Sequence, residues 1–125
     1  MTEAHFKQRT KELSLRIIRL VEQLPKGQAP SVIGRQLLRS GTSVGANYRA
    51  SCRGKSVADV ISKLAIVEKE ADESLYWMEL LVEARLVEHD RLADLMQEGE
   101  EILAMIVASI KTLRLRQKPN PKSKI

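Results

Sequence analysis

Apolar residues recur at steps of three and four along most of the chain, which is the spacing of one face of an α-helix. The pattern breaks near residues 25–27, 54–56 and 88–90, where proline, glycine or polar residues interrupt it. Four helices are therefore predicted, over about residues 4–24, 30–53, 57–87 and 91–116. Their apolar faces comprise, in chain order, Phe6, Leu13, Ile17, Leu20, Val21, Leu24; Ile33, Leu37, Gly41, Val44, Tyr48; Val60, Leu64, Val67, Ala71, Leu75, Met78, Val82; and Leu92, Leu95, Gly99, Ile102, Ile106, Ile110, Leu113.

The middle of the second predicted helix is unusually small, with the sequence SGTSVGA over residues 40–46. Taken alone this segment resembles a loop, but the apolar stripe passes through it in phase, which favours a helix. Gly41 and Gly45 lie one turn apart, so another backbone can approach closely there. Two glycines in a helix cost about 1 kcal/mol each relative to alanine, so close packing is expected to offset that cost.

Short turns place successive helices antiparallel, which predicts an all-α fold, an antiparallel up-down-up-down four-helix bundle over residues 1–117. Ser56 is the expected N-cap of the third helix, with Asp59 completing a capping box, and Asp90 is the expected cap of the fourth. Residues 118–125 contain two prolines and no apolar face, so a mobile basic tail is expected there. The tail cations are Lys118, Lys122 and Lys124.

A chain of 125 residues with 43% hydrophobic residues suits one domain with one core. No apolar run approaches the length of a membrane span, and the first residues lack the apolar region of a secretory signal. The single cysteine, Cys52, permits no intrachain disulfide. We therefore expect a cytoplasmic protein with no membrane association.

Charge is distributed unevenly along the chain. Residues 35–66 carry six bases against one acid, whereas residues 67–104 carry twelve acids against three bases. Such separated segments can pair within the chain, between copies of it, or with an anionic partner.

Catalytic and metal-binding patterns are missing from the sequence. A di-iron bundle needs Glu-x-x-His pairs, but Thr2 and Leu86 stand three residues before His5 and His89. Cys52 has no histidine nearby and is expected to be a structural thiol. We therefore predict no enzyme activity, no metal and no cofactor.

The acids of the third helix invite a structural explanation. If the second and third helices form a hairpin about Lys55, Arg39 faces the turn that holds Glu70 and Glu73. A partly buried ion pair between Arg39 and one of these acids is predicted, in preference to a ligand site.

The basic residues around the second turn are the stronger functional candidates, because clustered cations neutralise phosphates without reading bases. Aromatic residues make up only 3% of the chain, which disfavours a stacking platform for single strands. The candidate nucleic-acid-binding residues are Arg39, Arg49, Arg53, Lys55 and Lys63.

Three segments also carry a family resemblance: QLLRSGTSVGANYRA over residues 36–50, CRGKS over 52–56, and KLAIVEKEADESLYWMELL over 63–81. They resemble the bacterial four-helix bundle proteins encoded in intervening sequences of large-subunit ribosomal RNA, a family that includes the accessory protein of diversity-generating retroelements. The resemblance covers about residues 6–113 and is most specific from 39 to 81.

The resemblance implies a barrel-like homopentamer with a positively charged surface, whose retroelement members are thought to bind nucleic acid and a reverse transcriptase. Ser43, Asn47, Arg53, Ser56 and Glu73 match the motif positions of the family. From the sequence itself, Asn47 is expected to satisfy a backbone or arginine partner. Together with Glu70, the residues Ser43, Asn47, Ser56 and Glu73 are assigned a structural polar role.

Two functions remain open. The first is a non-enzymatic homo-oligomer that binds RNA or DNA by charge and shape. The second is a protein-interaction scaffold, in which the small segment 40–46 or the acidic fourth helix meets a partner protein and the charged faces serve self-assembly.

Overall fold

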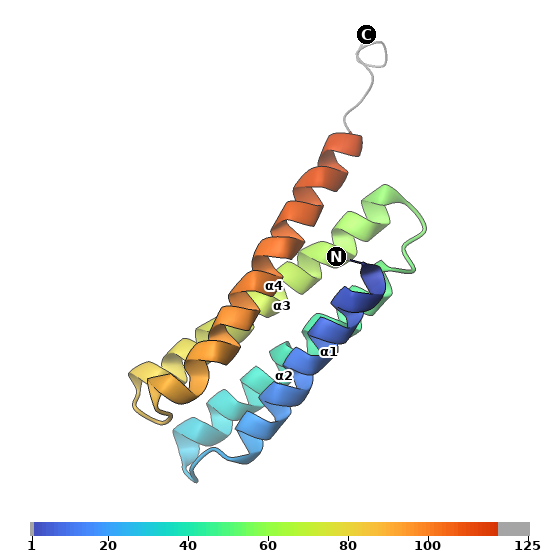
Figure 1. Cartoon of the computed structure of the whole chain (residues 1–125). Helices are drawn as coiled ribbons and strands as arrows, with labels where there is room; N and C mark the ends of the chain where they lie inside the picture. The colour runs from blue at the N-terminus through green and yellow to red at the C-terminus, as the bar shows by residue number, and fades with distance from the viewer. Residues whose placement is uncertain (1, 118–125) are drawn as a thin grey trace.

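The computed structural model describes residues 2–117 and contains four helices in chain order. They are α1 (Glu3–Glu22), α2 (Gln28–Ser51), α3 (Val57–Glu83) and α4 (His89–Arg116). Successive helices run in opposite directions and pack into a four-helix bundle (Figure 1), which confirms the predicted fold class. The predicted tail cations Lys118, Lys122 and Lys124 lie outside the described residues.

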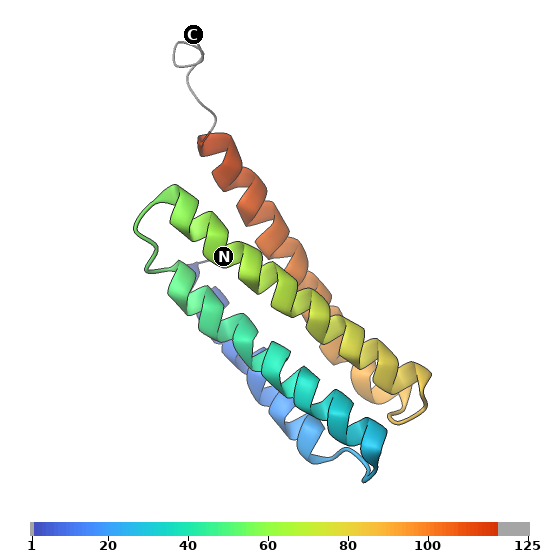
Figure 2. The same ribbon diagram turned by 180° about the vertical axis from the view of Figure 1, so that it is seen from behind.

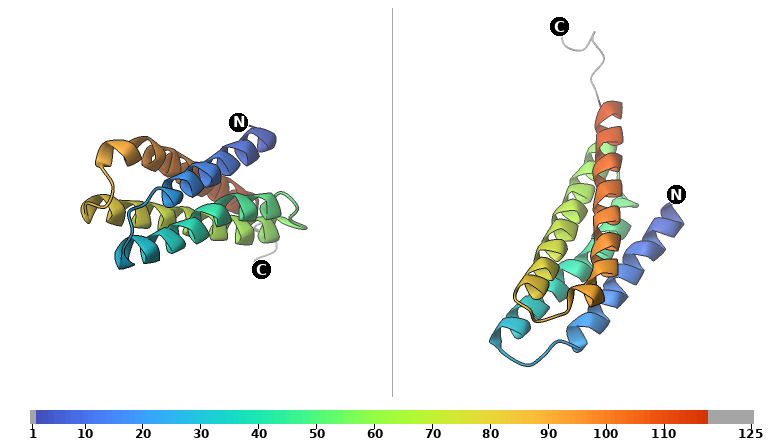
Figure 3. Two further views of the ribbon diagram at one scale, coloured as in Figure 1. Left: turned by 90° about the horizontal axis from the view of Figure 1, so that it is seen from below. Right: turned by 60° about the vertical axis from the view of Figure 1, so that its left-hand side comes forward.

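The core is built from the predicted apolar stripes. Leu13, Ile17, Leu37, Val44 and Met78 are almost wholly buried, as are their counterparts on α4. Among the described residues, α2 and α3 share the most extensive contact, and the view from behind shows them side by side (Figure 2). The contact between α1 and α4 is the smallest, and α1 diverges from α4 toward its N-terminal end (Figure 3).

Polar groups span this loose α1–α4 seam. Arg9 binds Glu98 through two hydrogen bonds of 2.7 Å, and a further guanidinium bond of 2.6 Å reaches Glu101. Farther along the seam, Arg16 pairs with Asp94 at 2.8 Å. Ion pairs therefore join α1 and α4, the two neighbouring helices that share the least contact.

Several helix boundaries differ from the sequence prediction. α2 begins at Gln28, because Gly27 adopts φ 144° as the N-cap and Pro30, which lacks an N–H, occupies the first turn without losing a hydrogen bond. α3 ends at Glu83 and not near residue 87, because Arg85 takes the left-handed conformation (φ 60°) and the N–H groups of Leu86 and Val87 turn back to Leu81.

The predicted cap of α4 was wrong. Glu88 is the N-cap and makes no side-chain capping bond, while Asp90 lies inside the first turn. A carboxylate in that position still interacts favourably with the helix dipole. No helix among residues 2–117 is long and apolar enough to cross a membrane.

Candidate nucleic-acid interface

Three of the predicted cations gather at one end of the bundle. Arg49 lies on the last turns of α2, and Arg53 and Lys55 belong to the turn that joins α2 to α3; all three are exposed. No acid occurs between Glu22 and Asp59, so α2 and both turns that flank it carry positive charge alone. Residues 23–58 therefore contain six lysines and arginines and no acid.

Lys63 belongs to a different arrangement at the start of α3. Its ammonium group lies 2.9 Å from an Asp59 oxygen, and the other Asp59 oxygen accepts the Lys55 N–H at 3.0 Å. Asp59 in turn donates its own N–H to Ser56 Oγ at 3.1 Å, which confirms Ser56 as the N-cap. The salt bridge with Lys63 and the Lys55 N–H lower the pKa of Asp59. Lys63 is thus partly neutralised within the chain.

Arg39 lies apart from the basic end, about 15 Å along α2 from Arg49 at 1.5 Å per residue. Its guanidinium pairs with Glu70 at 3.0 Å and with Glu73 at 3.4 Å, so the predicted ion pair is present and includes both acids. The guanidinium remains half exposed. A contact between Arg39 and a phosphate stays a prediction.

Ser43 and Asn47 have local structural roles. Ser43 Oγ donates to the carbonyl of Arg39 at 2.8 Å, and Asn47 Nδ2 donates to the carbonyl of Ser43 at 2.9 Å. Both side chains therefore bond backbone one turn earlier in α2, and the backbone partner expected for Asn47 is present.

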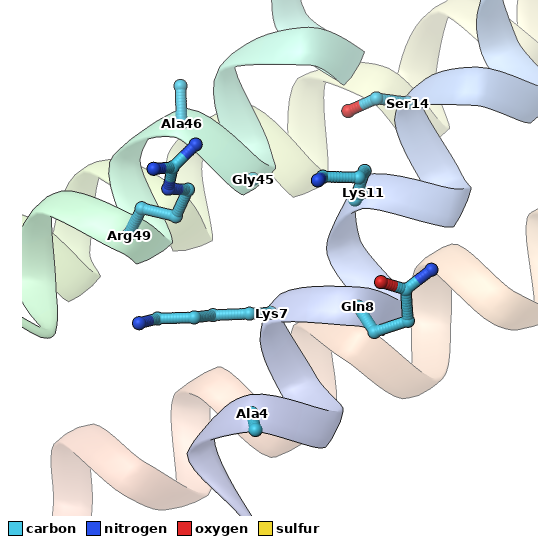
Figure 4. Close-up of a pocket in the computed structure, with 8 residues that line it drawn as sticks. All are labelled: Ala4, Lys7, Gln8, Lys11, Ser14, Gly45, Ala46 and Arg49. Carbon is cyan, nitrogen blue, oxygen red and sulfur yellow. The ribbon is translucent and has the colours of Figure 1, made fainter.

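Two cations outside the predicted set also lie at the basic end. Lys7 and Lys11 extend from α1 toward α2, where Arg49 lies opposite them (Figure 4). Together they line a groove of about 440 Å³ between α1 and α2. The one sequence signal for them is their one-turn spacing beside the apolar stripe of α1, which does not reveal which helix they face. We call this feature the α1–α2 groove; its lining residues are Ala4, Lys7, Gln8, Lys11, Ser14, Gly45, Ala46 and Arg49.

α1 and α2 approach closely at Gly41 and Gly45, and Gly45 lines the groove. A Cβ atom at Gly41 would clash with the fully buried Ile17 side chain. Ser14 Oγ bridges the helices by donating to the Gly41 carbonyl at 3.1 Å. The close approach predicted for Gly41 and Gly45 is thus directed at α1.

Cys52 lies half-buried at the end of α2, near Tyr48. Burial raises the pKa of the Cys52 thiol, and burial together with the neighbouring thiol raises the pKa of Tyr48. The thiol therefore stays protonated at neutral pH, as a structural cysteine does. Residues 2–117 hold no cluster of three or more histidine, cysteine or carboxylate side chains suited to a metal ion.

Comparison with known proteins identifies relatives. The family model described as 23S rRNA-intervening sequence protein matches residues 2–108. A crystal structure of a protein of unknown function from the S23 ribosomal protein family of Bacteroides thetaiotaomicron VPI-5482 is 36% identical to this chain. The match covers 89% of this chain and 99% of that one, with a TM-score of 0.82. No curated protein matches the chain.

Proposed function

The chain belongs to the family of 23S rRNA-intervening sequence proteins, and we propose that it is a non-enzymatic, oligomeric protein of the cytoplasm that binds nucleic acid. Binding uses charge and shape, through the basic end formed by Arg49, Arg53 and Lys55 with Lys7 and Lys11. The observation that carries the proposal is the acid-free stretch from α2 into the next turn, whose cations at this end are exposed. Cations arranged in this way contact phosphates and confer affinity that is largely independent of sequence.

The aromatic side chains support recognition of the backbone over recognition of bases. Phe6 and Tyr48 pack edge-to-face against each other, with ring centroids 4.6 Å apart, and Phe6 is buried. Tyr76 and Trp77 form a similar pair on α3, away from the groove lining. Stacking of successive bases on exposed rings is therefore not part of the proposal.

Replacement of Arg49, Arg53 and Lys55 together by glutamine tests this function. Binding to structured RNA and duplex DNA is expected to weaken, with the logarithmic salt slope smaller by about 3. The helical circular dichroism signal should not change, because these side chains are exposed.

A triple variant at the opposite end of the bundle, with Arg19, Lys26 and Arg85 replaced by glutamine, is the matched control. It removes the same charge and is expected to bind nearly as tightly as the original protein. Undiminished binding by the first variant, or an equal loss of affinity in both variants, would show that the nucleic-acid-binding site does not lie at the basic end.

A second candidate function is a protein-interaction scaffold, which would contact its partner through exposed apolar side chains. Every helix exposes at least one large apolar residue, and Val32 and Tyr76 are 49% and 54% exposed. Exposed groups of this kind can contact another copy or a partner protein. The mass of the protein measured by light scattering at low and high salt separates the cases: an assembly held by exposed charge pairs dissociates at high salt, and one held by apolar contact does not.

A further inference from the structure

The α1–α2 groove differs from the rest of the basic end because it is a concave site with cations on both sides. Lys7 and Lys11 come from α1 and Arg49 comes from α2 (Figure 4). Between them the lining is small, with Ala4, Gly45 and Ala46 leaving open a volume of about 440 Å³. A compact ligand can therefore lie between cations from two helices.

The three cations are not equally available. Lys7 lies 3.4 Å from Glu3, an exposed pair one turn apart on α1. Among the described residues, Lys11 and Arg49 make neither a side-chain hydrogen bond nor a salt bridge, and no carboxylate lines the groove. The groove thus presents two unpaired positive charges, with a third that Glu3 partly neutralises.

The remaining lining indicates the chemical class of the ligand. Ser14 Oγ already donates to the carbonyls of Thr10 and Gly41, so its proton is engaged within the protein. No aromatic ring lines the groove, so a base would find nothing to stack on. Positive groups on two sides instead suit an anion whose charge is spread over several oxygens, as in a phosphate.

We propose that the α1–α2 groove is the binding site for one phosphate group of the nucleic-acid backbone. The phosphate lies between Lys11 and Arg49, with Lys7 as a weaker third contact. This inference rests on the proposed function, because it assigns that function one defined phosphate position. Arg49 also stands four residues before Arg53, near the end of the basic stretch. A nucleic-acid strand with one phosphate in the groove would therefore continue toward Arg53 and Lys55.

A titration with inorganic phosphate at constant ionic strength tests whether the groove binds phosphate. The backbone amides of Gly45 and Ala46, followed by ¹H–¹⁵N NMR, are expected to shift and saturate with phosphate but not with chloride. Lys11→Gln and Arg49→Gln should each abolish saturation over the same concentration range. Arg19→Gln removes one equal charge about 12 Å farther along α1, and it should leave the titration unchanged.

Glu3→Gln is expected to have the opposite effect on phosphate affinity. It frees Lys7 from its partner, so phosphate should bind more tightly than in the original protein. A groove that does not saturate with phosphate, or that responds equally in the Lys11, Arg49 and Arg19 variants, would overturn the proposal.

The same single variants are then titrated with duplex RNA across a salt series. Lys11→Gln and Arg49→Gln should each lower the logarithmic salt slope by about 1, and Arg19→Gln should not. If these two variants lose phosphate saturation but keep the salt slope for RNA, the groove binds free phosphate and not a phosphate of the nucleic-acid backbone. That result would refute this inference and leave the proposed function standing. If the original protein binds neither RNA nor duplex DNA, the proposed function and the backbone-phosphate site both fail, and saturation by inorganic phosphate then identifies a site for the free ion.

Discussion

Arg39 and Glu70 join α2 to α3 across 3.0 Å, and their exposure is unequal: the Glu70 side chain is 7% exposed and the Arg39 side chain 50%. Glu73 shares the same guanidinium at 3.4 Å. Loss of the arginine leaves a buried carboxylate without its partner, whereas loss of Glu70 leaves a cation that water already reaches.

Arg39→Gln should therefore destabilise the protein by about 2 kcal/mol, below the usual cost of breaking a fully buried pair because the guanidinium is half exposed. Glu70→Gln should cost about 1 kcal/mol or less, and the double variant should recover part of the Arg39→Gln loss. Urea unfolding measures all three free energies. A larger loss for Glu70→Gln than for Arg39→Gln would contradict the account.

Gly41 and Gly45 should respond to alanine in opposite ways. A Cβ atom at Gly41 collides with Ile17, whereas one at Gly45 meets Thr10 at an ordinary 3.4 Å. Gly41→Ala is expected to destabilise by about 1–2 kcal/mol through overpacking. Gly45→Ala is expected to stabilise by up to about 1 kcal/mol through helix propensity.

The control for this pair is Ile17→Val, which removes the Cδ1 methyl that a Cβ atom at position 41 would meet. Ile17→Val alone should cost about 1 kcal/mol. In the Gly41→Ala background it should cost nothing. Additive losses in thermal or urea unfolding would show that the two side chains do not meet.

Asp59 makes the stability of α3 depend on acid pH. Its pKa is lowered by the hydrogen bonds from Lys63 and from the Lys55 N–H, so its contribution is complete above the ordinary aspartate value of about 4. The contribution is lost as the pH falls through the lowered value. The melting temperature of the original protein should therefore exceed that of Asp59→Asn at neutral pH, and the difference should shrink in strong acid. A difference independent of pH would contradict this assignment.

Arg9 should resist replacement by lysine. Its guanidinium makes two bonds to Glu98 and one to Glu101, and a lysine ammonium cannot reproduce that fork. Arg9→Lys is expected to cost about 1 kcal/mol and to speed amide exchange in α1. Arg16→Lys is the control, because its partner Asp94 is 89% exposed and the change should cost less than about 0.5 kcal/mol.

Much of the architecture follows from the sequence, because apolar residues at helical spacing bury the same faces that the pattern selects. The ion pair of Arg39 could be predicted as well. In an antiparallel hairpin the residue numbers of two facing positions add up to a constant that the turn sets, so a turn at Lys55 places Arg39 opposite the acids of the third helix. The end of α3 could not: Leu86 and Val87 continue the apolar pattern, but they reach the core from a turn after the left-handed Arg85. Hydroxyl groups also escape a hydrophobic pattern, as shown by the buried Ser40–Ser74 bond of 2.9 Å.

The candidate site could be predicted only in part from the sequence, for a related reason. Arg49, Arg53 and Lys55 are neighbours in sequence, so the sequence alone predicts that they cluster. Lys7 and Lys11 join them only because α1 lies against α2 at Gly41 and Gly45. Spacing along one helix does not specify the side from which its partner approaches.

Whether the basic end binds phosphates can be measured by binding of the purified protein to duplex DNA and structured RNA across a salt series. If it does, the logarithm of the association constant for DNA falls linearly with the logarithm of salt concentration, with a slope of magnitude about 3 to 5 per protomer for Lys7, Lys11, Arg49, Arg53 and Lys55. Absence of binding at low salt, or binding that salt does not weaken, would contradict phosphate binding by the basic end.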